Sequence, residues 1–147
     1  MKITICGSIA FYEEMLDIKG KLERIGYQIK LPPSEIEDDN GKMITVKEYY
    51  SKRKSETSNI GCIWDKKEEA MREHFRKVER SDAVLILNYD KNNISNYIGV
   101  NTLLELGLAF HLNKRLFLWN DILEIDSKEE ILGMKPTVIN KDLTEIK

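Results

Sequence analysis

Cysteine is scarce in this chain: Cys6 and Cys62 are the only two among 147 residues. They form no C-x-x-C pair and have no nearby histidine at the spacing of a zinc motif, so the sequence predicts no metal and no cofactor. Two cysteines also make no disulfide framework, which favours a reducing, cytoplasmic compartment. Cys6 falls within an apolar run, where we interpret it as a small core residue.

Long apolar runs and an excess of basic charge are missing as well. No stretch approaches the roughly 18 apolar residues of a membrane span, and the first apolar run is too short for a signal peptide. The 23 Lys and Arg are balanced by 25 Asp and Glu, a formal net charge of -2. The short cationic runs at 52–54 and 66–67 are typical of solvated surface. We therefore expect neither a membrane nor a nucleic acid as partner.

The first third of the chain carries a strand, a helix and a second strand. Residues 2–6 are apolar and β-branched, which indicates a strand that ends at Gly7 and Ser8. A helical stripe follows, with Gly26 as its stop signal, and residues 27–31 form the next strand before two prolines. Such a unit implies parallel strands. The stripe consists of Phe11, Met15, Ile18, Leu22 and Ile25.

The rest of the chain continues the alternation. Helices are predicted at 65–81 and 102–112, a short one begins at Ser127, and strands are predicted at 83–87, 115–119 and 137–140. The helix at 102–112 is apolar nearly all round, so we expect it to be buried on more than one face. Residues 1–147 thus form one three-layer α/β/α domain with about five mostly parallel strands in flavodoxin-like order 2-1-3-4-5. Residues 34–63 have no clean hydrophobic period. We expect them to form an irregular, partly helical insertion or lid; a disordered surface loop is an equal alternative.

Two places have residues suited to chemistry. The first is the turn of Gly7, Ser8 and Ile9, between the first strand and the first helix. Its amides suit a phosphate, and the Ser8 hydroxyl offers a further hydrogen bond. An ordinary helix N-cap explains Ser8 equally well.

The second place is the polar stretch from Asn88 to Glu105, which lies beyond the carboxyl end of the strand at 83–87. Ligands of open α/β sheets bind in that crevice. Glu105, at a helix N-terminus among apolar groups, is suited to be a nucleophile. The competing interpretation is a capping box, Thr102-x-x-Glu105. The predicted pocket residues of this stretch are Asn88, Asp90, Tyr97, Gly99 and Asn101.

Three segments together resemble a known family: strand-Gly-Ser-Ile, helix-Ser-Asp-strand, and Gly-x-x-x-x-x-Glu-Leu-Gly-x-Ala-Phe followed by a Lys-Arg strand. The pattern is similar to the nucleoside 2-deoxyribosyltransferase-like superfamily, which includes deoxynucleoside monophosphate N-glycosidases. The resemblance covers most of the chain, loosely at 32–63. It implies cleavage of an N-glycosidic bond, with Glu105 attacking the sugar C1′ and a second base or water resolving the glycosyl-enzyme.

The resemblance also assigns further positions. Gly7, Ser8 and Ile9 match the family's phosphate- or sugar-facing loop, and Gly99 falls where the glycosidases have a phosphate-binding serine. Eight residues before Asp82, the family commonly has a catalytic aspartate; this chain has His74, which can act as acid or base near neutral pH. Asp90 and Asp82 are possible substitutes for the missing acid, although Asp82 fits a structural role at the strand entrance. Leu103 replaces a glycine two residues before the nucleophile.

The sequence therefore predicts an enzyme that cleaves or transfers the N-glycosidic bond of a nucleoside or (deoxy)nucleotide. The alternative is a non-catalytic nucleotide-binding module on the same fold. We also expect a homodimer or higher homo-oligomer, because the helix at 102–112 has more apolar surface than one sheet face needs. The resemblance implies the same assembly.

Overall fold

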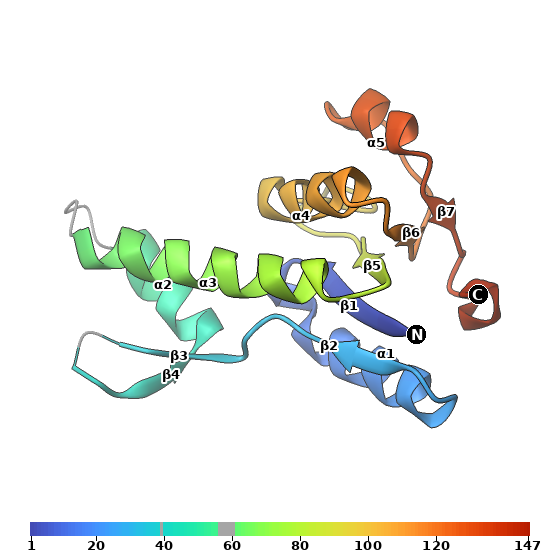
Figure 1. Ribbon diagram of the computed structural model, residues 1–147. Helices are drawn as coiled ribbons and strands as arrows, with labels where there is room; N and C mark the ends of the chain where they lie inside the picture. The colour runs from blue at the N-terminus through green and yellow to red at the C-terminus, as the bar shows by residue number, and fades with distance from the viewer. Residues whose placement is uncertain (39, 56–60) are drawn as a thin grey trace.

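The computed structural model describes residues 1–38, 40–55 and 61–147. Its centre is a parallel sheet in the order β2 (Gln28–Lys30), β1 (Lys2–Gly7), β5 (Ala83–Leu87), β6 (Arg115–Leu118) and β7 (Thr137–Val138) (Figure 1). All four pairings of neighbouring strands are parallel. Counted along the chain, these strands have the order 2-1-3-4-5, so the predicted fold class and topology are confirmed.

One face of the sheet is covered by α1 (Tyr12–Arg24), which follows the 3-10 turn η1 (Ile9–Phe11). Alternate residues of a strand face opposite sides, and Ile3 and Ile5 pack on this side. The partners from α1 are Met15, Ile18 and Leu22. A second 3-10 turn, η2 (Leu143–Glu145), contributes Leu143 to the edge of this core.

The apolar stripe of the first helix is one residue shorter than predicted. Ile25 is 59% exposed, so its assignment to the core was wrong. The helix ends at Arg24, and Gly26 has a φ of +94°. A glycine adopts this left-handed conformation without steric cost, and the chain turns away before Ile25 reaches the sheet.

The opposite face is covered by α3 (Gly61–Glu79), α4 (Val100–His111) and α5 (Lys128–Met134). Cys6 belongs to this side, because it alternates with Ile5 along β1. Between residues 64 and 79 of α3, His74 and Val78 are buried, whereas Met71 and Phe75 are only partly buried. His74 therefore lies on the buried face of α3 together with Val78.

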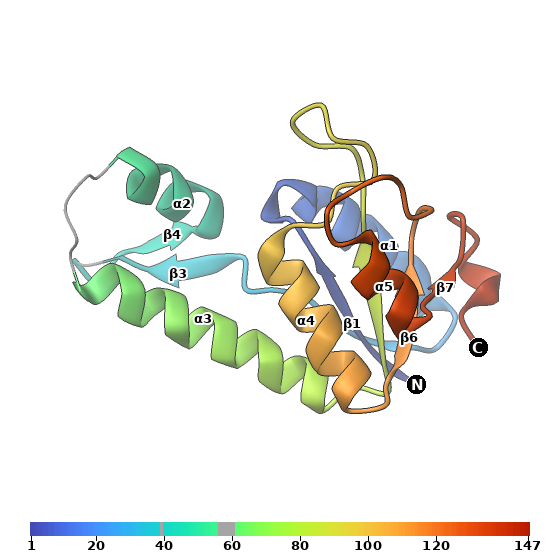
Figure 2. The ribbon, with the colours of Figure 1, turned by 90° about the horizontal axis from the view of Figure 1, so that it is seen from above.

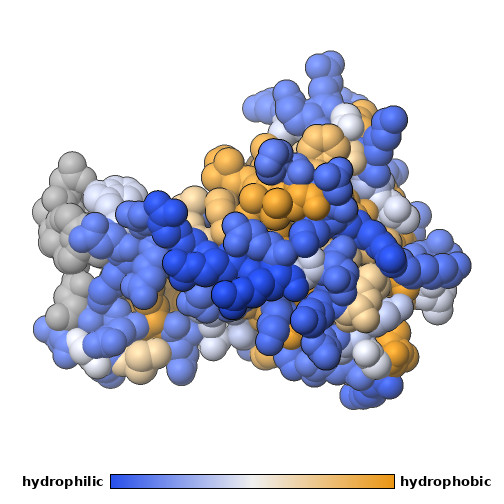
Figure 3. All heavy atoms as spheres, viewed as in Figure 1, coloured by the Kyte–Doolittle hydropathy of each residue, from blue (hydrophilic) through white to orange (hydrophobic). Residues whose placement is uncertain are grey.

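Two predictions about the helix after β5 are wrong. It begins at Val100 with Gly99 as N-cap, so Thr102 and Glu105 lie inside the helix and form no capping box. It is also buried on one face only, by Thr102, Glu105, Leu106 and Ala109. Its outer face leaves apolar surface in solvent, with Val100, Leu104 and Phe110 exposed by 78%, 49% and 50%. Figure 3 shows hydrophobic surface gathered over α4.

The segment expected as an irregular insertion contains regular structure. Strands β3 (Glu35–Glu37) and β4 (Met43–Thr45) pair antiparallel, and α2 (Val46–Ser55) follows directly. Ile44 and Tyr49 form a small core against Ile36. We call these three elements the hairpin–α2 unit; it extends to one side of the main sheet (Figure 2). Part of the predicted insertion, residues 39 and 56–60, lies outside the described residues.

No helix in the described part of the chain combines the length and the apolar character that a bilayer crossing requires.

Candidate functional site

A cavity of about 330 Å³ opens between the carboxyl ends of the strands and the hairpin–α2 unit. It is the place that open α/β sheets use for ligands. Most predicted site residues line it: Gly7, Ser8, Ile9, His74, Tyr97, Gly99, Asn101 and Glu105. Two stretches that are far apart in sequence, the first turn and the start of α4, therefore meet in one pocket with a residue of α3.

Glu105 lies in the wall of this cavity, on the buried face of α4, with only 3% of its surface exposed. Asn101 precedes it by one helical turn and donates a hydrogen bond from Nδ2 to Glu105 Oε1 over 2.8 Å. Residues four apart face each other on a helix. The glutamate is thus held by a neighbouring side chain and does not cap its own helix.

Burial sets the protonation of Glu105. Desolvation raises the pKa of this carboxyl from 4.5 to about 7, because a buried carboxylate loses its hydration. The neighbouring Cys6 thiol and the charge of Lys67 act in the opposite direction. The group therefore changes charge in the neutral range, which is typical of functional carboxyls.

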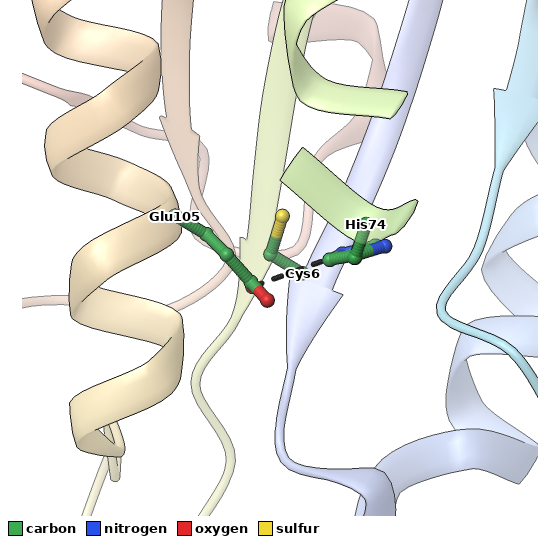
Figure 4. Close-up of side chains that lie close together, drawn as sticks. All are labelled: Cys6, His74 and Glu105. Carbon is green, nitrogen blue, oxygen red and sulfur yellow. Dashed lines mark ion pairs between the residues drawn. The ribbon is translucent and has the colours of Figure 1, made fainter. Parts of the chain in front are cut away.

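His74 approaches Glu105 from α3, with Nε2 placed 3.7 Å from Oε2 (Figure 4). That distance is too long for a hydrogen bond. Burial lowers the pKa of His74 from 6.5 to about 4, with help from the charge of Lys77, so the ring is neutral at pH 7. We therefore describe the pair as a close contact of a carboxyl and a neutral imidazole. Neither ring nitrogen has a hydrogen-bond partner among the residues that the structure describes.

Cys6 completes a cluster with these two residues. It is fully buried, as expected for a core residue, and its sulfur lies within 4.8 Å of the donor atoms of His74 and Glu105. Burial, together with the neighbouring charge of Glu105, raises the pKa of Cys6 well above its usual value. The thiol therefore stays protonated. The sequence offered no sign of this proximity, since Cys6 and Glu105 are on different elements.

The first turn contains a side-chain cap and a neighbouring lysine. Ser8 caps η1, because its Oγ accepts a hydrogen bond from the Ala10 amide over 3.3 Å. The same Oγ accepts a hydrogen bond from Lys91 Nζ over 2.7 Å. Lys91 also lies over the Tyr97 ring, 5.0 Å from its centroid. This end of the cavity therefore carries a cation between two hydroxyl-bearing side chains.

Gly99 and Tyr97 are sterically linked. A Cβ at position 99 would lie only 3.0 Å from the Tyr97 hydroxyl oxygen, so this position has no room for a side chain unless Tyr97 moves. The Tyr97 hydroxyl thus occupies the space next to Gly99 into which a serine would project. Tyr97 therefore supplies the hydroxyl group at this point of the cavity wall.

Asn88 and Asp90 do not line the cavity. Asn88 is fully buried and joins the ends of two strands, accepting from the Asn120 amide over 2.8 Å and donating to the Asn120 carbonyl over 3.0 Å. Asp90 accepts a hydrogen bond from the Asn96 amide over 2.9 Å within its own loop. The structure therefore places both residues in the support of the site.

The hairpin–α2 unit and α3 add residues that the sequence analysis did not select. Lys67 Nζ donates to the Tyr50 hydroxyl over 3.2 Å, and the Arg53 guanidinium lies 4.4 Å from the centroid of the Tyr50 ring. All three line the cavity. The sequence did contain a signal for these residues: two adjacent tyrosines among cationic residues, in a stretch without a regular hydrophobic period. The part of the cavity wall that α2 and α3 form is therefore cationic and aromatic.

Neither a protein-family model nor a curated protein sequence matches the chain. Among solved structures, a 2-deoxyribosyltransferase from Bacillus psychrosaccharolyticus matches with a TM-score of 0.53 and 11% identity, covering 93% of this chain and 98% of that one. A CMP N-glycosidase from Clostridium botulinum has a TM-score of 0.49 and 11% identity, over 94% of this chain and 85% of the other. At such low identity, the first match speaks for the fold alone. The resemblance seen in the sequence is confirmed at that level: this chain has the fold of the 2-deoxyribosyltransferase.

Proposed function

We propose that the protein cleaves or transfers the N-glycosidic bond of a nucleoside or (deoxy)nucleotide, with Glu105 as the nucleophile. The observation that carries the proposal is the position of Glu105: a carboxyl, 3% exposed, in the wall of a 330 Å³ cavity at the strand ends. A fold shared with a deoxyribosyltransferase supports the same chemistry. The proposed reaction uses no cofactor.

The reaction runs in two steps. Glu105, as the carboxylate, forms a bond from one oxygen to the sugar C1′ while the bond from C1′ to the base nitrogen breaks. The bonding electron pair leaves with the base, which takes a proton from solvent water. Water or a second base then attacks C1′ from the opposite face and releases Glu105. Water as acceptor gives hydrolysis, and a second base gives transfer.

His74 is suited to the second step. Its ring is neutral, and both nitrogens are free of hydrogen bonds within the described part of the chain, so Nε2 can accept the proton of an attacking water. The pKa of about 4 makes it a weak base. A retaining glycosidase uses a second carboxyl at this stage. We propose that His74 replaces that carboxyl and that Asp90 instead shapes the loop.

The remaining cavity residues bind the substrate. We propose that the sugar or its 5′-phosphate lies against Gly7, Ser8 and Ile9, next to Lys91 and the Tyr97 hydroxyl. The ammonium group of Lys91 suits an anion. Asn101 keeps Glu105 in place, Gly99 allows Tyr97 to approach, and Asn88 ties the strand ends that carry the loops.

We also propose that the protein assembles as a homodimer or higher homo-oligomer. The exposed apolar face of α4, formed by Val100, Leu104 and Phe110, is the surface that a second copy would cover. Contiguous apolar patches of this kind mark interaction sites.

The test is incubation with a panel of nucleosides, deoxynucleosides and their 5′-monophosphates, followed by chromatography for free base. Wild type is expected to release base, and Glu105→Ala is not. Glu130→Ala serves as the matched control, because Glu130 is an exposed glutamate on α5. Equal release by wild type and Glu105→Ala would refute the assignment.

The alternative is a nucleotide-binding module without turnover. It is favoured by the lining of the cavity, where the described residues include no carboxyl besides Glu105. In that case, members of the panel raise the melting temperature of wild type, and no base is released. A panel that gives neither base nor a thermal shift excludes both functions.

A further inference from the structure

Cys6, His74 and Glu105 together form a set of potential metal ligands. The donor atoms of the three side chains all lie within 4.8 Å of one another. Each comes from a different element, β1, α3 or α4, and all three residues are buried, being exposed by 0%, 3% and 3%. No short sequence motif indicates this set of ligands, because its members lie far apart along the chain.

The donor atoms select a class of ion. A thiolate sulfur, an imidazole nitrogen and a carboxylate oxygen suit Zn²⁺ and its spectroscopic substitute Co²⁺, whereas Mg²⁺ and Ca²⁺ require oxygen ligands. Zinc lies about 2.0–2.3 Å from such donors, so the donors of a tetrahedral site are about 3.3–3.8 Å apart. The 3.7 Å between His74 Nε2 and Glu105 Oε2 already falls in this range.

His74 provides the independent sign of a ligand. Its side chain is buried, and neither nitrogen has a hydrogen-bond partner in the described part of the chain. A buried polar group without a partner is costly, so it points to something that binds there. Figure 4 shows the ring directed toward Glu105 and the end of β1 that carries Cys6.

The site has one open side. His74 and Glu105 line the cavity, whereas Cys6 lies behind them in the core. An ion held by the three side chains would therefore keep its fourth position toward the cavity. Three protein ligands and one open position make the pattern of an accessible zinc site.

We propose that Cys6, His74 and Glu105 bind a Zn²⁺-class ion and that the bound ion blocks the chemistry of Glu105. On binding, the Cys6 thiol transfers its proton to solvent and a sulfur–metal bond takes its place. Glu105 then donates its electron pair to the ion and no longer to C1′. The binding itself is independent of the proposed function; only the inhibition rests on it.

The chain offers matched controls for two of the ligands. Cys62 is the other cysteine and His111, which is exposed at the end of α4, is the other histidine. Protein freed of metal by a chelator is titrated with Co²⁺, and the near-ultraviolet band of a thiolate–cobalt bond is recorded. Wild type and Cys62→Ser are expected to show the band, and Cys6→Ser is not. A band that persists in Cys6→Ser, or none in wild type, overturns the proposal.

A second variant covers the case in which Cys6→Ser does not fold. His74→Gln retains the thiol and is expected to weaken Zn²⁺ binding by roughly a hundredfold or more, since even outer-shell partners contribute about 10- to 100-fold. His111→Gln is expected to bind as wild type does. Equal Zn²⁺ affinity of His74→Gln and His111→Gln, measured by calorimetry, contradicts the site.

Inhibition is measured separately from binding. Zn²⁺ is expected to stop base release by wild type, and excess chelator is expected to restore it. If the metal ion binds but wild type releases no base in the presence of chelator, the metal site is supported and the proposed enzymatic activity is refuted. Base release that Zn²⁺ does not change, at concentrations that saturate the cobalt-defined site, refutes the inhibition.

Discussion

Glu105 Oε2 and His74 Nε2 lie 3.7 Å apart, and neither residue is more than 3% exposed. Burial moves their pKa values in opposite directions, to about 7 for the carboxyl and about 4 for the imidazole. Both groups are therefore neutral in mildly acidic solution. Ionising Glu105 at neutral pH places one negative charge beside a ring that stays neutral.

The first prediction concerns stability and pH. The folded pKa of Glu105, about 7, is above its usual 4.5. The stabilisation of its neutral form is therefore complete below pH 4.5 and is lost as pH rises through 7. Because a tenfold change in an acid dissociation constant corresponds to about 1.4 kcal/mol, the full loss is about 3 kcal/mol. Glu105→Gln removes this loss, so its stability relative to wild type is expected to rise by about 2.5 kcal/mol between pH 5 and pH 8, since part of the loss already occurs below pH 5.

Urea unfolding of both proteins at the two pH values, in the presence of a chelator, provides the measurement. The difference between variant and wild type removes the contributions of groups that titrate alike in both. A difference that stays constant between the acidic and the alkaline measurement would mean that Glu105 is not desolvated.

Asn101 is expected to position Glu105. Asn101→Ala removes a hydrogen bond to a carboxylate, which typically contributes about 1.5–3 kcal/mol. The corresponding fall in kcat/KM for base release is about ten- to a hundredfold. Asn101→Asp tests the mechanism further, because a second carboxylate one turn away raises the pKa of Glu105 and shifts the rise of the rate to higher pH. If the pH dependence of the rate is the same in Asn101→Asp as in wild type, Asn101 contributes to folding alone.

Lys91 is expected to recognise an anionic substrate end. Its ammonium group, 2.7 Å from Ser8 Oγ, belongs to a residue that lines the cavity. Lys91→Met is expected to lower kcat/KM for a 5′-monophosphate by about tenfold or more, with a smaller effect on the nucleoside. Lys21→Met is the control, since Lys21 pairs with Asp17 on the exposed side of α1. Equal losses for both substrates would place the phosphate elsewhere.

Asn88 is expected to support the fold and not the substrate. Asn88→Ala leaves the backbone amide and carbonyl of Asn120 without their side-chain partner at a partly buried position, which costs about 1–3 kcal/mol of stability. The melting temperature should fall, while KM of the folded protein stays close to that of wild type. A large rise in KM without a loss of stability would show that Asn88 contributes to substrate binding.

The exposed face of α4 provides a prediction about assembly. Leu104 is 49% exposed, and Leu104→Glu places a charge in the surface that a second copy would cover. Light scattering is expected to show an oligomer for wild type and a smaller species for the variant. A monomeric wild type at micromolar concentration would rule out this assembly.

The arrangement of the strands could be predicted because period-2 and period-3.6 patterns record which side chains are buried. The cluster at the centre of the site could not. Cys6, His74 and Glu105 are distant in sequence, and only the crossing of β1, α3 and α4 brings them together. Local patterns contain no information on such contacts.

One local signal was also misleading, and one pair of strands gave no recognisable signal. Thr102-x-x-Glu105 has the spacing of a capping box, but the helix already begins at Val100, after the extended backbone of Gly99, and Thr102 lies inside it. The hairpin of β3 and β4 consists of three-residue strands, EIE and MIT, in a polar stretch. Runs this short are below the length at which alternation can be recognised.

The central claim is a covalent bond between Glu105 and the sugar, and intact-protein mass spectrometry after acid quenching tests it most directly. Wild type mixed with a substrate from the panel is expected to gain the mass of one glycosyl group, located by peptide analysis to Glu105. Glu105→Gln should gain none. Base release by wild type without any adduct, together with undiminished release by Glu105→Gln, would contradict the account.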